Sequence, residues 1–137
     1  MNKIAIIYWS QTGNTEAMAQ ALFDEAKAKG KDVEMSFVSD FDASTIDQYD
    51  LLAFGCPSMG IEVLEEAEFE PFFSSIEDKL EGKNVLLFGS YGWGDGQWMR
   101  DWEERVKSKG ANLLGDQGII CQEEPDDETI EKLKSCI

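Results

Sequence analysis

Residues 8–15 have the sequence Tyr-Trp-Ser-Gln-Thr-Gly-Asn-Thr. They are rich in hydrogen-bond donors and include no basic side chain. The segment joins an apolar run at the N-terminus to a run with helical spacing. A loop that opens a helix after a strand directs backbone N–H groups and the positive end of the helix dipole at one place, which suits an anion such as phosphate. The alternative is an ordinary turn in which Ser, Thr and Asn cap the helix.

Neutral groups would bind a phosphate here. The hydroxyls of Ser10, Thr12 and Thr15, the amide of Asn14 and the backbone N–H groups around Gly13 are the candidate donors. The Gly-Lys-Ser/Thr ending of a nucleotide P-loop and the GxGxxG pattern of dinucleotide sites are both missing from this stretch. The segment therefore predicts a phosphate site of a different kind.

Two further loops have unusual composition. The stretch 56–60 is Cys-Pro-Ser-Met-Gly, and 90–96 is Ser-Tyr-Gly-Trp-Gly-Asp-Gly. Glycines allow a backbone to approach a ligand closely, and a planar ligand could stack between Met59 and Trp93. A phosphate site beside a slot for a ring predicts a mononucleotide-like cofactor. Alternatively, Trp93 is a partly buried surface aromatic.

Alternating strands and helices position these loops. Continuous apolar runs predict buried strands at 4–9, 51–55 and 85–89, a more exposed strand at 33–38, and a last strand at 113–121 interrupted by two glycines. Helical spacing predicts helices at 14–29, 64–80 and 98–109, with Pro71 starting or kinking the second, and a short final helix capped by Asp126 or Asp127.

This alternation predicts an α/β fold in which residues 1–137 form a single domain, with a doubly wound five-stranded parallel sheet and helices on both faces. Ligands bind such sheets outside the carboxyl ends of the strands, where the strand order reverses. All three unusual loops follow apolar strands. We therefore expect them to meet at one edge of the sheet.

The net charge of −16, with no histidine, excludes some classes of partner. Nucleic acid and anionic membrane surfaces would be repelled, whereas basic proteins would be attracted. Residues 61–81 hold eight acidic side chains against one lysine, which suggests a docking surface. Alternatively, the charge only aids solubility.

Three widely spaced cysteines, Cys56, Cys121 and Cys136, predict free thiols in a reducing compartment. With neither CxxC spacing nor histidine, no metal site is predicted. No apolar stretch reaches the about 18 residues of a membrane span, and no signal peptide is evident. We expect a soluble cytoplasmic protein.

The motifs resemble those of short-chain flavodoxins of the clostridial type, which bind FMN and transfer electrons. The resemblance covers nearly the whole chain, through Tyr-Trp-Ser-x-Thr-Gly-Asn-Thr-Glu at 8–16, Gly-Cys-Pro-x-Met-Gly at 55–60, Glu-Pro-Phe at 70–72 and Phe-Gly-Ser-Tyr-Gly-Trp-Gly-Asp-Gly at 88–96. It implies the strand order 2-1-3-4-5, for which flavodoxins are themselves a model case, with FMN at the switch point.

The resemblance also implies roles for individual residues. The 10–15 loop would hold the FMN phosphate, Met59 and Trp93 would flank the isoalloxazine ring, the backbone of residues 91–92 would face its pyrimidine edge, and Glu62 would accept a hydrogen bond from N3. The candidate cofactor-binding residues are Ser10, Gln11, Thr12, Gly13, Asn14, Thr15, Pro57, Ser58, Met59, Gly60, Ile61, Glu62, Ser90, Tyr91, Gly92, Trp93 and Gly94.

Ile61 departs from the family pattern, which has a small or acidic residue at this position. The resemblance implies that the peptide after Gly60 turns over on reduction, so that its carbonyl accepts a hydrogen bond from flavin N5. If this requires φ > 0 at Ile61, the β-branched side chain opposes it by roughly 1–2 kcal/mol. Alternatively, Ile61 adopts an extended conformation and covers the edge of the ring.

The predicted function is that of a low-potential one-electron carrier, monomeric and without substrate turnover of its own, that shuttles electrons between basic redox partner proteins such as reductases and oxidoreductases. One alternative is an FMN-dependent NAD(P)H:quinone reductase, which needs a substrate pocket and usually a longer chain. Another is a non-redox signalling domain of the same fold, which would lack flavin.

Overall fold

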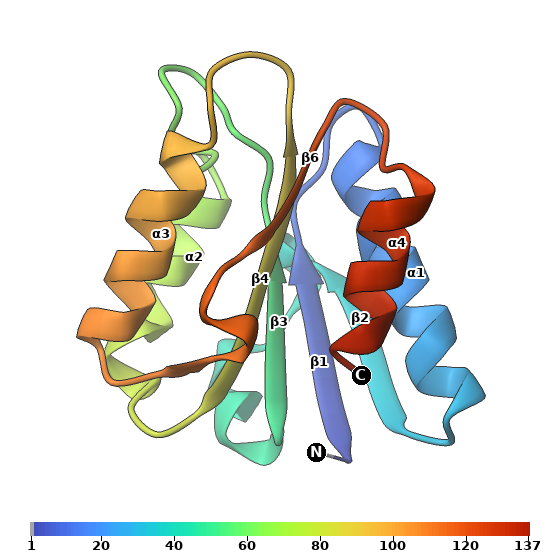
Figure 1. Cartoon of the computed structure of the whole chain (residues 1–137). Helices are drawn as coiled ribbons and strands as arrows, with labels where there is room; N and C mark the ends of the chain where they lie inside the picture. Colours follow the sequence, from blue (N-terminus) through green and yellow to red (C-terminus); the bar gives the residue numbers. More distant parts are fainter. Residues whose placement is uncertain (1) are drawn as a thin grey trace.

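A parallel sheet lies between two layers of helices in the computed structural model, which describes residues 2–137 (Figure 1). Its strands are β1 (Lys3–Tyr8), β2 (Asp32–Phe37), β3 (Leu51–Gly55), β4 (Asn84–Tyr91), β5 (Asn112–Leu113) and β6 (Ile119–Gln122). The order is β2-β1-β3-β4-β5, with β6 also paired to β4, and every pairing is parallel. The predicted order 2-1-3-4-5 is confirmed.

Within the described residues, four α-helices cover the sheet: α1 (Asn14–Ala28), α2 (Phe69–Ile76), α3 (Gln97–Ser108) and α4 (Asp127–Ser135). The helices α2 and α3 lie on one face, and α1 and α4 lie on the other (Figure 1). Short 3₁₀ turns occupy Val38–Asp40, Ala43–Gln48, Glu77–Lys79 and Leu114–Asp116. In residues 2–137, no helix is both long and apolar enough to cross a membrane.

The last predicted strand is divided into β5 and β6. Between them, Gly115 (φ 74°) and Asp116 (φ 63°) adopt left-handed conformations that cannot continue a strand. The side chain of Lys107 donates a hydrogen bond to the carbonyl of Asp116 at 2.9 Å. Both pieces pair with β4, so together they form one interrupted edge strand in the fifth position of the sheet.

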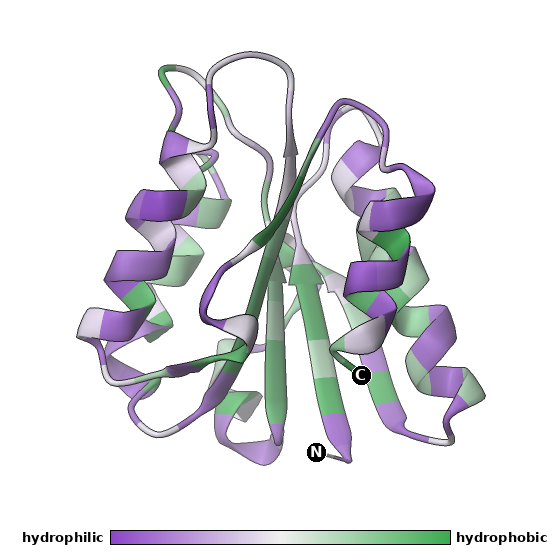
Figure 2. Cartoon of the chain, viewed as in Figure 1, coloured by the Kyte–Doolittle hydropathy of each residue, from purple (hydrophilic) through white to green (hydrophobic). Residues whose placement is uncertain are grey.

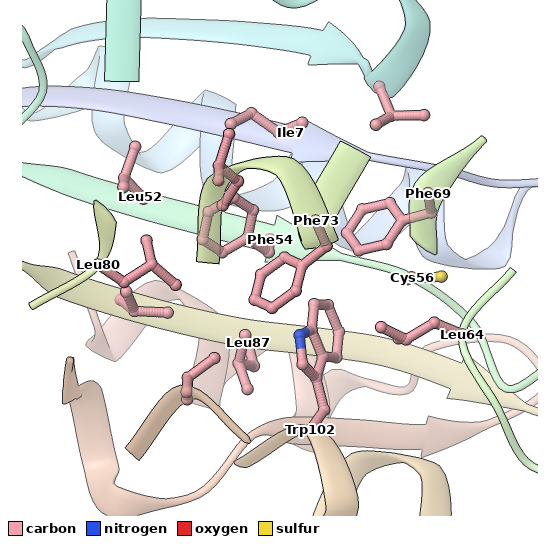
Figure 3. Packing of buried hydrophobic residues seen from close by; sticks show 14 of the residues in the cluster. Ile7, Leu52, Phe54, Cys56, Leu64, Phe69, Phe73, Leu80, Leu87 and Trp102 are labelled. Carbon is pink, nitrogen blue, oxygen red and sulfur yellow. The ribbon is translucent and has the colours of Figure 1, made fainter. Parts of the chain in front are cut away.

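Hydrophobic residues concentrate in the strands and on the sides of the helices that face the sheet (Figure 2). On the α2/α3 face, Phe69 and Phe73 stack with an interplanar angle of 12°, and Trp102 meets both rings edge-on at centroid distances of 5.5 and 5.7 Å (Figure 3). Such aromatic pairs fix the relative placement of the helices that carry them. The loops that follow β3 and β4 are therefore attached to a rigid base.

The predicted helix over 64–80 is wrong in its first turn, because α2 begins only at Phe69. Glu65 is buried, and its carboxylate accepts hydrogen bonds from the three backbone N–H groups of residues 67–69, each at 2.8 Å. A side chain that caps a helix from before its start holds the preceding backbone out of the helix. Pro71 then falls in the first turn, where its missing N–H costs nothing.

Candidate functional site

A cavity of about 130 Å³ opens where the loops after β1, β3 and β4 meet. From β1 and β3 the chain moves to opposite sides of the sheet, so the cavity lies where the strand order reverses. Most of the predicted site residues line it, together with Glu123 from the loop after β6: Ser10, Gln11, Thr12, Asn14, Thr15, Pro57, Ser58, Met59, Ser90, Tyr91 and Gly92.

The loop 10–15 presents free N–H groups at the start of α1. Ser10 Oγ accepts hydrogen bonds from the backbone N–H groups of Gly13 and Glu16, both at 3.2 Å, and so caps the helix in part. Five other backbone N–H groups of this loop have no hydrogen-bond partner among residues 2–137: those of Ser10, Gln11, Thr12, Asn14 and Thr15. The loop thus combines the cap and the open donors that the two sequence interpretations expected.

Thr15 joins the first loop to the third. Its side chain is 1% exposed, and its Oγ1 accepts a hydrogen bond from the backbone N–H of Ser90 at 3.3 Å. Nearby, the phenol of Tyr8 donates to Glu16 Oε2 at 2.9 Å. Burial and this hydrogen bond raise the pKa of Tyr8, so the phenol is a neutral donor at neutral pH.

The base of the loop 56–62 continues the pairing of β3 with β4. The backbone N–H of Ser58 donates to the carbonyl of Ser90 at 3.0 Å, and the indole N–H of Trp98 donates to the carbonyl of Cys56 at 3.1 Å. Burial raises the pKa of the Cys56 thiol, which therefore stays protonated. Cys56, Cys121 and Cys136 are all free, as expected.

The tip of this loop is a short hairpin, in which Met59 and Val63 exchange backbone hydrogen bonds of 2.8 and 2.9 Å. Gly60 (φ 52°) and Glu62 (φ 55°) have left-handed conformations, and Ile61 does not. The Ile61 side chain is 85% exposed. In this form of the turn, Ile61 therefore avoids the strain that a positive φ would impose on a β-branched residue.

Some predicted site residues lie outside the cavity wall: Gly13, Gly60, Ile61, Glu62, Trp93 and Gly94. Trp93 is 62% exposed, so its ring remains accessible on the third loop. The carboxylate of Glu62 lies against that loop, where Oε1 accepts hydrogen bonds from the backbone N–H groups of Asp95 at 3.2 Å and Gln97 at 3.1 Å. Its predicted contact with flavin N3 remains a prediction.

Glu123 is the residue of the cavity that the sequence analysis missed. Its backbone N–H donates to the carbonyl of Tyr91 at 2.8 Å, and its φ of 59° turns the chain sharply after β6. The available signal was its place directly beyond the last strand, at the same edge as the other loops. Glu123 adds a carboxylate to a cavity that no Lys or Arg of the described chain lines.

The acidic run 61–81 is only partly available to a partner. Glu65 is buried, and Arg105 of α3 binds both Glu70 and Glu77 of the α2 segment at 2.7–2.8 Å. Glu65 therefore caps α2, and Glu70 and Glu77 join the α2 segment to α3 through Arg105. The expectation that the whole run forms a docking surface is therefore corrected, and its exposed members remain as candidates.

A larger cavity, of about 520 Å³, lies between α3, α4 and the interrupted edge strand. Its wall includes Met99, Arg100, Ile120 and Lys132. None of the predicted site residues lines it. The larger cavity is therefore not the one that the sequence analysis predicts as the site, whereas the three loops with unusual composition line the smaller one.

Known proteins are similar to this chain in sequence and in fold. Residues 6–135 match the family model described as Flavodoxin. A flavodoxin from Clostridium beijerinckii is 51% identical over 122 residues (89% of this chain, 88% of that protein), and one from Megasphaera elsdenii is 46% identical over 123 residues (90% and 88%). The solution structure of two-electron reduced Megasphaera elsdenii flavodoxin has a TM-score of 0.86 and 42% identity, covering 97% of this chain and 96% of that one. The chain belongs to the flavodoxin family, whose members bind FMN and carry electrons rather than turn over a substrate.

Proposed function

We propose that FMN binds across the cavity with its phosphate in the 10–15 loop and its ring between Met59 and Trp93. The observation that supports this most strongly is the set of five open N–H groups in the 10–15 loop, which matches the needs of a phosphate. The neutral hydroxyls of the same loop add further donors. The residues present therefore fit the cofactor.

The size of the cavity supports a ring that lies partly outside it. About 130 Å³ is well below the roughly 300–1,000 Å³ of sites that enclose a ligand. The phosphate end would fill the cavity, and the ring would rest beside the exposed face of Trp93. FMN, when bound, accepts and gives up electrons one at a time. An accessible ring edge suits transfer between proteins.

Charge supports a low reduction potential. Each carboxylate about 10 Å from the ring opposes an added electron by roughly 0.4–1.7 kcal/mol at an effective dielectric constant of 20–80. For one electron, about 1.4 kcal/mol corresponds to about 59 mV. The chain has a net charge of −16, and Glu123 lies in the cavity wall itself. The second reduction potential should therefore become less negative at high salt, and an unchanged potential would contradict this account.

Exposed carboxylates at the same edge would dock basic redox partners. We name Glu66, Glu68, Glu123 and Glu124 the acidic rim; all four are exposed. The first two precede α2, and the others follow β6 and precede α4, which lies on the other face of the sheet (Figure 1). An acidic rim steers basic partners into weak, rapid encounters. This role suits a monomeric cytoplasmic carrier.

Titration of the purified chain with FMN tests the proposal. We expect one FMN per chain, a flavin spectrum in the visible range, and two one-electron steps during gradual reduction with dithionite. Riboflavin is the matched control, because it has the same ring without the phosphate and should bind more weakly. A protein that is colourless after excess FMN has been removed would refute the function. Equal binding of riboflavin and FMN would refute the placement of the phosphate.

A second assay addresses the reductase alternative. NAD(P)H and a quinone are supplied to the FMN-loaded protein, and NAD(P)H oxidation is followed by absorbance. An electron carrier should leave the rate at the background level of free FMN. A saturable rate well above that background would favour the quinone reductase.

A further inference from the structure

The outer edge of β6 lies in the wall of the larger cavity, whose volume is about 520 Å³. β6 runs between α3 and α4 in front of β4 (Figure 1), and within residues 2–137 it pairs with β4 alone. A strand at the edge of a sheet has a row of unpaired backbone groups that can pair with another chain. We propose that this groove binds an extended peptide segment of a partner protein, with alternating apolar and acidic side chains, as a strand added beside β6.

The pairing of β6 with β4 identifies the backbone groups that are open. The backbone N–H of Glu123 donates to the carbonyl of Tyr91 in β4, so Glu123 faces β4. Successive residues of a strand direct their backbone groups to opposite sides, and the groups of Ile120 and Gln122 therefore face outward. The backbone N–H and C=O groups of these two residues have no hydrogen-bond partner in the described part of the chain. Two donors and two acceptors are thus available to an added strand.

Glu103 of α3 closes one end of this edge. Its Oε2 accepts a hydrogen bond from the backbone N–H of Gly118 at 2.7 Å. Gly118 precedes Ile120 by two residues, so its N–H also points outward. A side chain of the protein itself therefore satisfies this outward donor, whereas the following ones at Ile120 and Gln122 stay open. The carboxylate of Glu103 marks the place where an added strand has to end.

The walls of the groove determine which side chains a bound strand should carry. Met99 and Arg100 of α3 line one side, and Lys132 of α4 lines the other. Side chains of an added strand would point alternately to these two sides. Lys132 is 64% exposed, and its ion pair with Glu128 spans 3.6 Å, so its charge remains available to an acidic side chain. Apolar side chains would contact Met99.

Local charge supports an acidic segment. The chain has 12 basic and 28 acidic side chains, yet two basic residues line this cavity and its one carboxylate, that of Glu103, is already bound to Gly118. No residue of the described chain lines both this cavity and the cofactor cavity. A partner segment can therefore hold the carrier at β6 and leave the cofactor cavity uncovered.

Amide hydrogen exchange of the purified chain with FMN present, measured by NMR, tests the proposal with one synthetic peptide. The probe is the acetylated and amidated peptide Val-Thr-Val-Glu-Val-Thr. At ten times its Kd the peptide leaves only about a tenth of the chains free, so exchange at Ile120 and Gln122 should slow about tenfold. The N–H of Cys121 faces β4 and is the internal control, whose exchange should not change. Unchanged exchange at Ile120 and Gln122 with about 1 mM peptide would overturn the proposal.

Ile120→Pro removes the central donor of the open edge. Proline is tolerated in an edge strand where its missing N–H would face outward, so the pairing with β4 should persist. Peptide binding should weaken by about tenfold, because one carbonyl of the peptide loses its donor. Ile120→Val is the matched control, since it keeps the N–H and a β-branched side chain, and its Kd should stay within about twofold. Equal Kd values for the two variants would overturn the proposal.

Two lysines of α4 provide a test that does not depend on the folding of Ile120→Pro. Lys132→Gln should weaken peptide binding by about two- to fivefold. Lys134→Gln removes the same charge from the same helix but outside the cavity wall, and should leave the Kd unchanged. Equal effects of the two substitutions would contradict the proposal, as would equal binding of a peptide with Lys in place of Glu. If exchange at Ile120 slows with rising protein concentration and no peptide, a second copy occupies the edge and the proposal fails.

Discussion

Glu65 and Glu66 are adjacent carboxylates with different surroundings, and their substitutions should affect different properties of the protein. Glu65 is 7% exposed and accepts hydrogen bonds from the three N–H groups of residues 67–69, all at 2.8 Å. Glu66 is exposed. Glu65→Ala should lower the stability of the fold, and Glu66→Ala should weaken the attraction of a basic partner.

The expected loss for Glu65→Ala follows from these contacts. Removing a helix cap costs up to about 2 kcal/mol, and a buried N–H left without an acceptor costs about 1–3 kcal/mol. The N–H of Phe69 is buried, whereas water can reach the start of the turn. The two contributions together give about 3 kcal/mol, a large share of the roughly 5–15 kcal/mol that holds a domain folded.

Urea unfolding and thermal melting measure this loss. A decrease of about 3 kcal/mol corresponds to a Tm lower by about 6–12 °C for a chain of this size. Glu65→Gln keeps one oxygen acceptor, so its stability should lie between that of the unsubstituted protein and that of Glu65→Ala. Glu66→Ala should change the free energy of unfolding by less than about 0.5 kcal/mol. Equal stability of the Glu65→Ala and Glu66→Ala variants would refute the assignment of Glu65 as the cap.

Electron transfer to cytochrome c, a basic haem protein, provides the second half of the comparison. Glu66→Ala should slow the association rate at low ionic strength, and the difference should vanish at high salt. Glu65→Gln should leave this rate unchanged while the protein is folded. A reversed pattern would place the docking surface on the buried side of the loop, contrary to the structure.

Three other substitutions test the contacts between loops and helices. Thr15→Val leaves the backbone N–H of Ser90 without its acceptor, so the free energy of unfolding measured in urea should fall by about 1–2 kcal/mol, and FMN should bind more weakly in a titration. Arg105→Lys replaces a planar group that binds Glu70 and Glu77 together, and should lower stability by roughly 2 kcal/mol in the same assay. The hydrogen bond from Arg105 holds the pKa of Glu70 below its ordinary value of 4.5. The contact therefore contributes its full stability above about pH 4.5, and this stability is lost as the pH falls through the lower pKa that Glu70 has in the folded protein. Unfolding measured from pH 6 down to pH 3 should show a smaller loss for Glu70→Gln than for the unsubstituted chain, and parallel curves would exclude this contact as a cause of acid sensitivity.

The arrangement of the sheet and of three loops could be predicted because the relevant signals are local. Strands buried on both faces are continuously apolar, as in 4–9 and 51–55, and parallel strands place the loops that follow them at one edge. The composition of those loops then indicated the chemistry. The structure brings most of the predicted residues together around one cavity.

Side-chain contacts, some local and some between distant residues, determined the features that the sequence could not show. Glu65 begins α2 late because its side chain folds over the next turn, although its own sequence pattern continues the helix. Arg105 lies 35 residues from Glu70, so pairing within the acidic run was not visible. Glu123 reaches the cavity only because the break at 115–116 shifts the pairing of β6 along β4.

The cavity draws its wall from nearly the whole length of the chain, from Ser10 to Glu123. A ligand that touches all four loops can bind only when β1, β3, β4 and β6 are in place together. Binding is then coupled to the folding of the entire chain, and a ligand at 100 times its Kd adds about 2.7 kcal/mol to the stability of the native state. Supply of the cofactor would therefore set not only how many chains are active but also how many survive proteolysis.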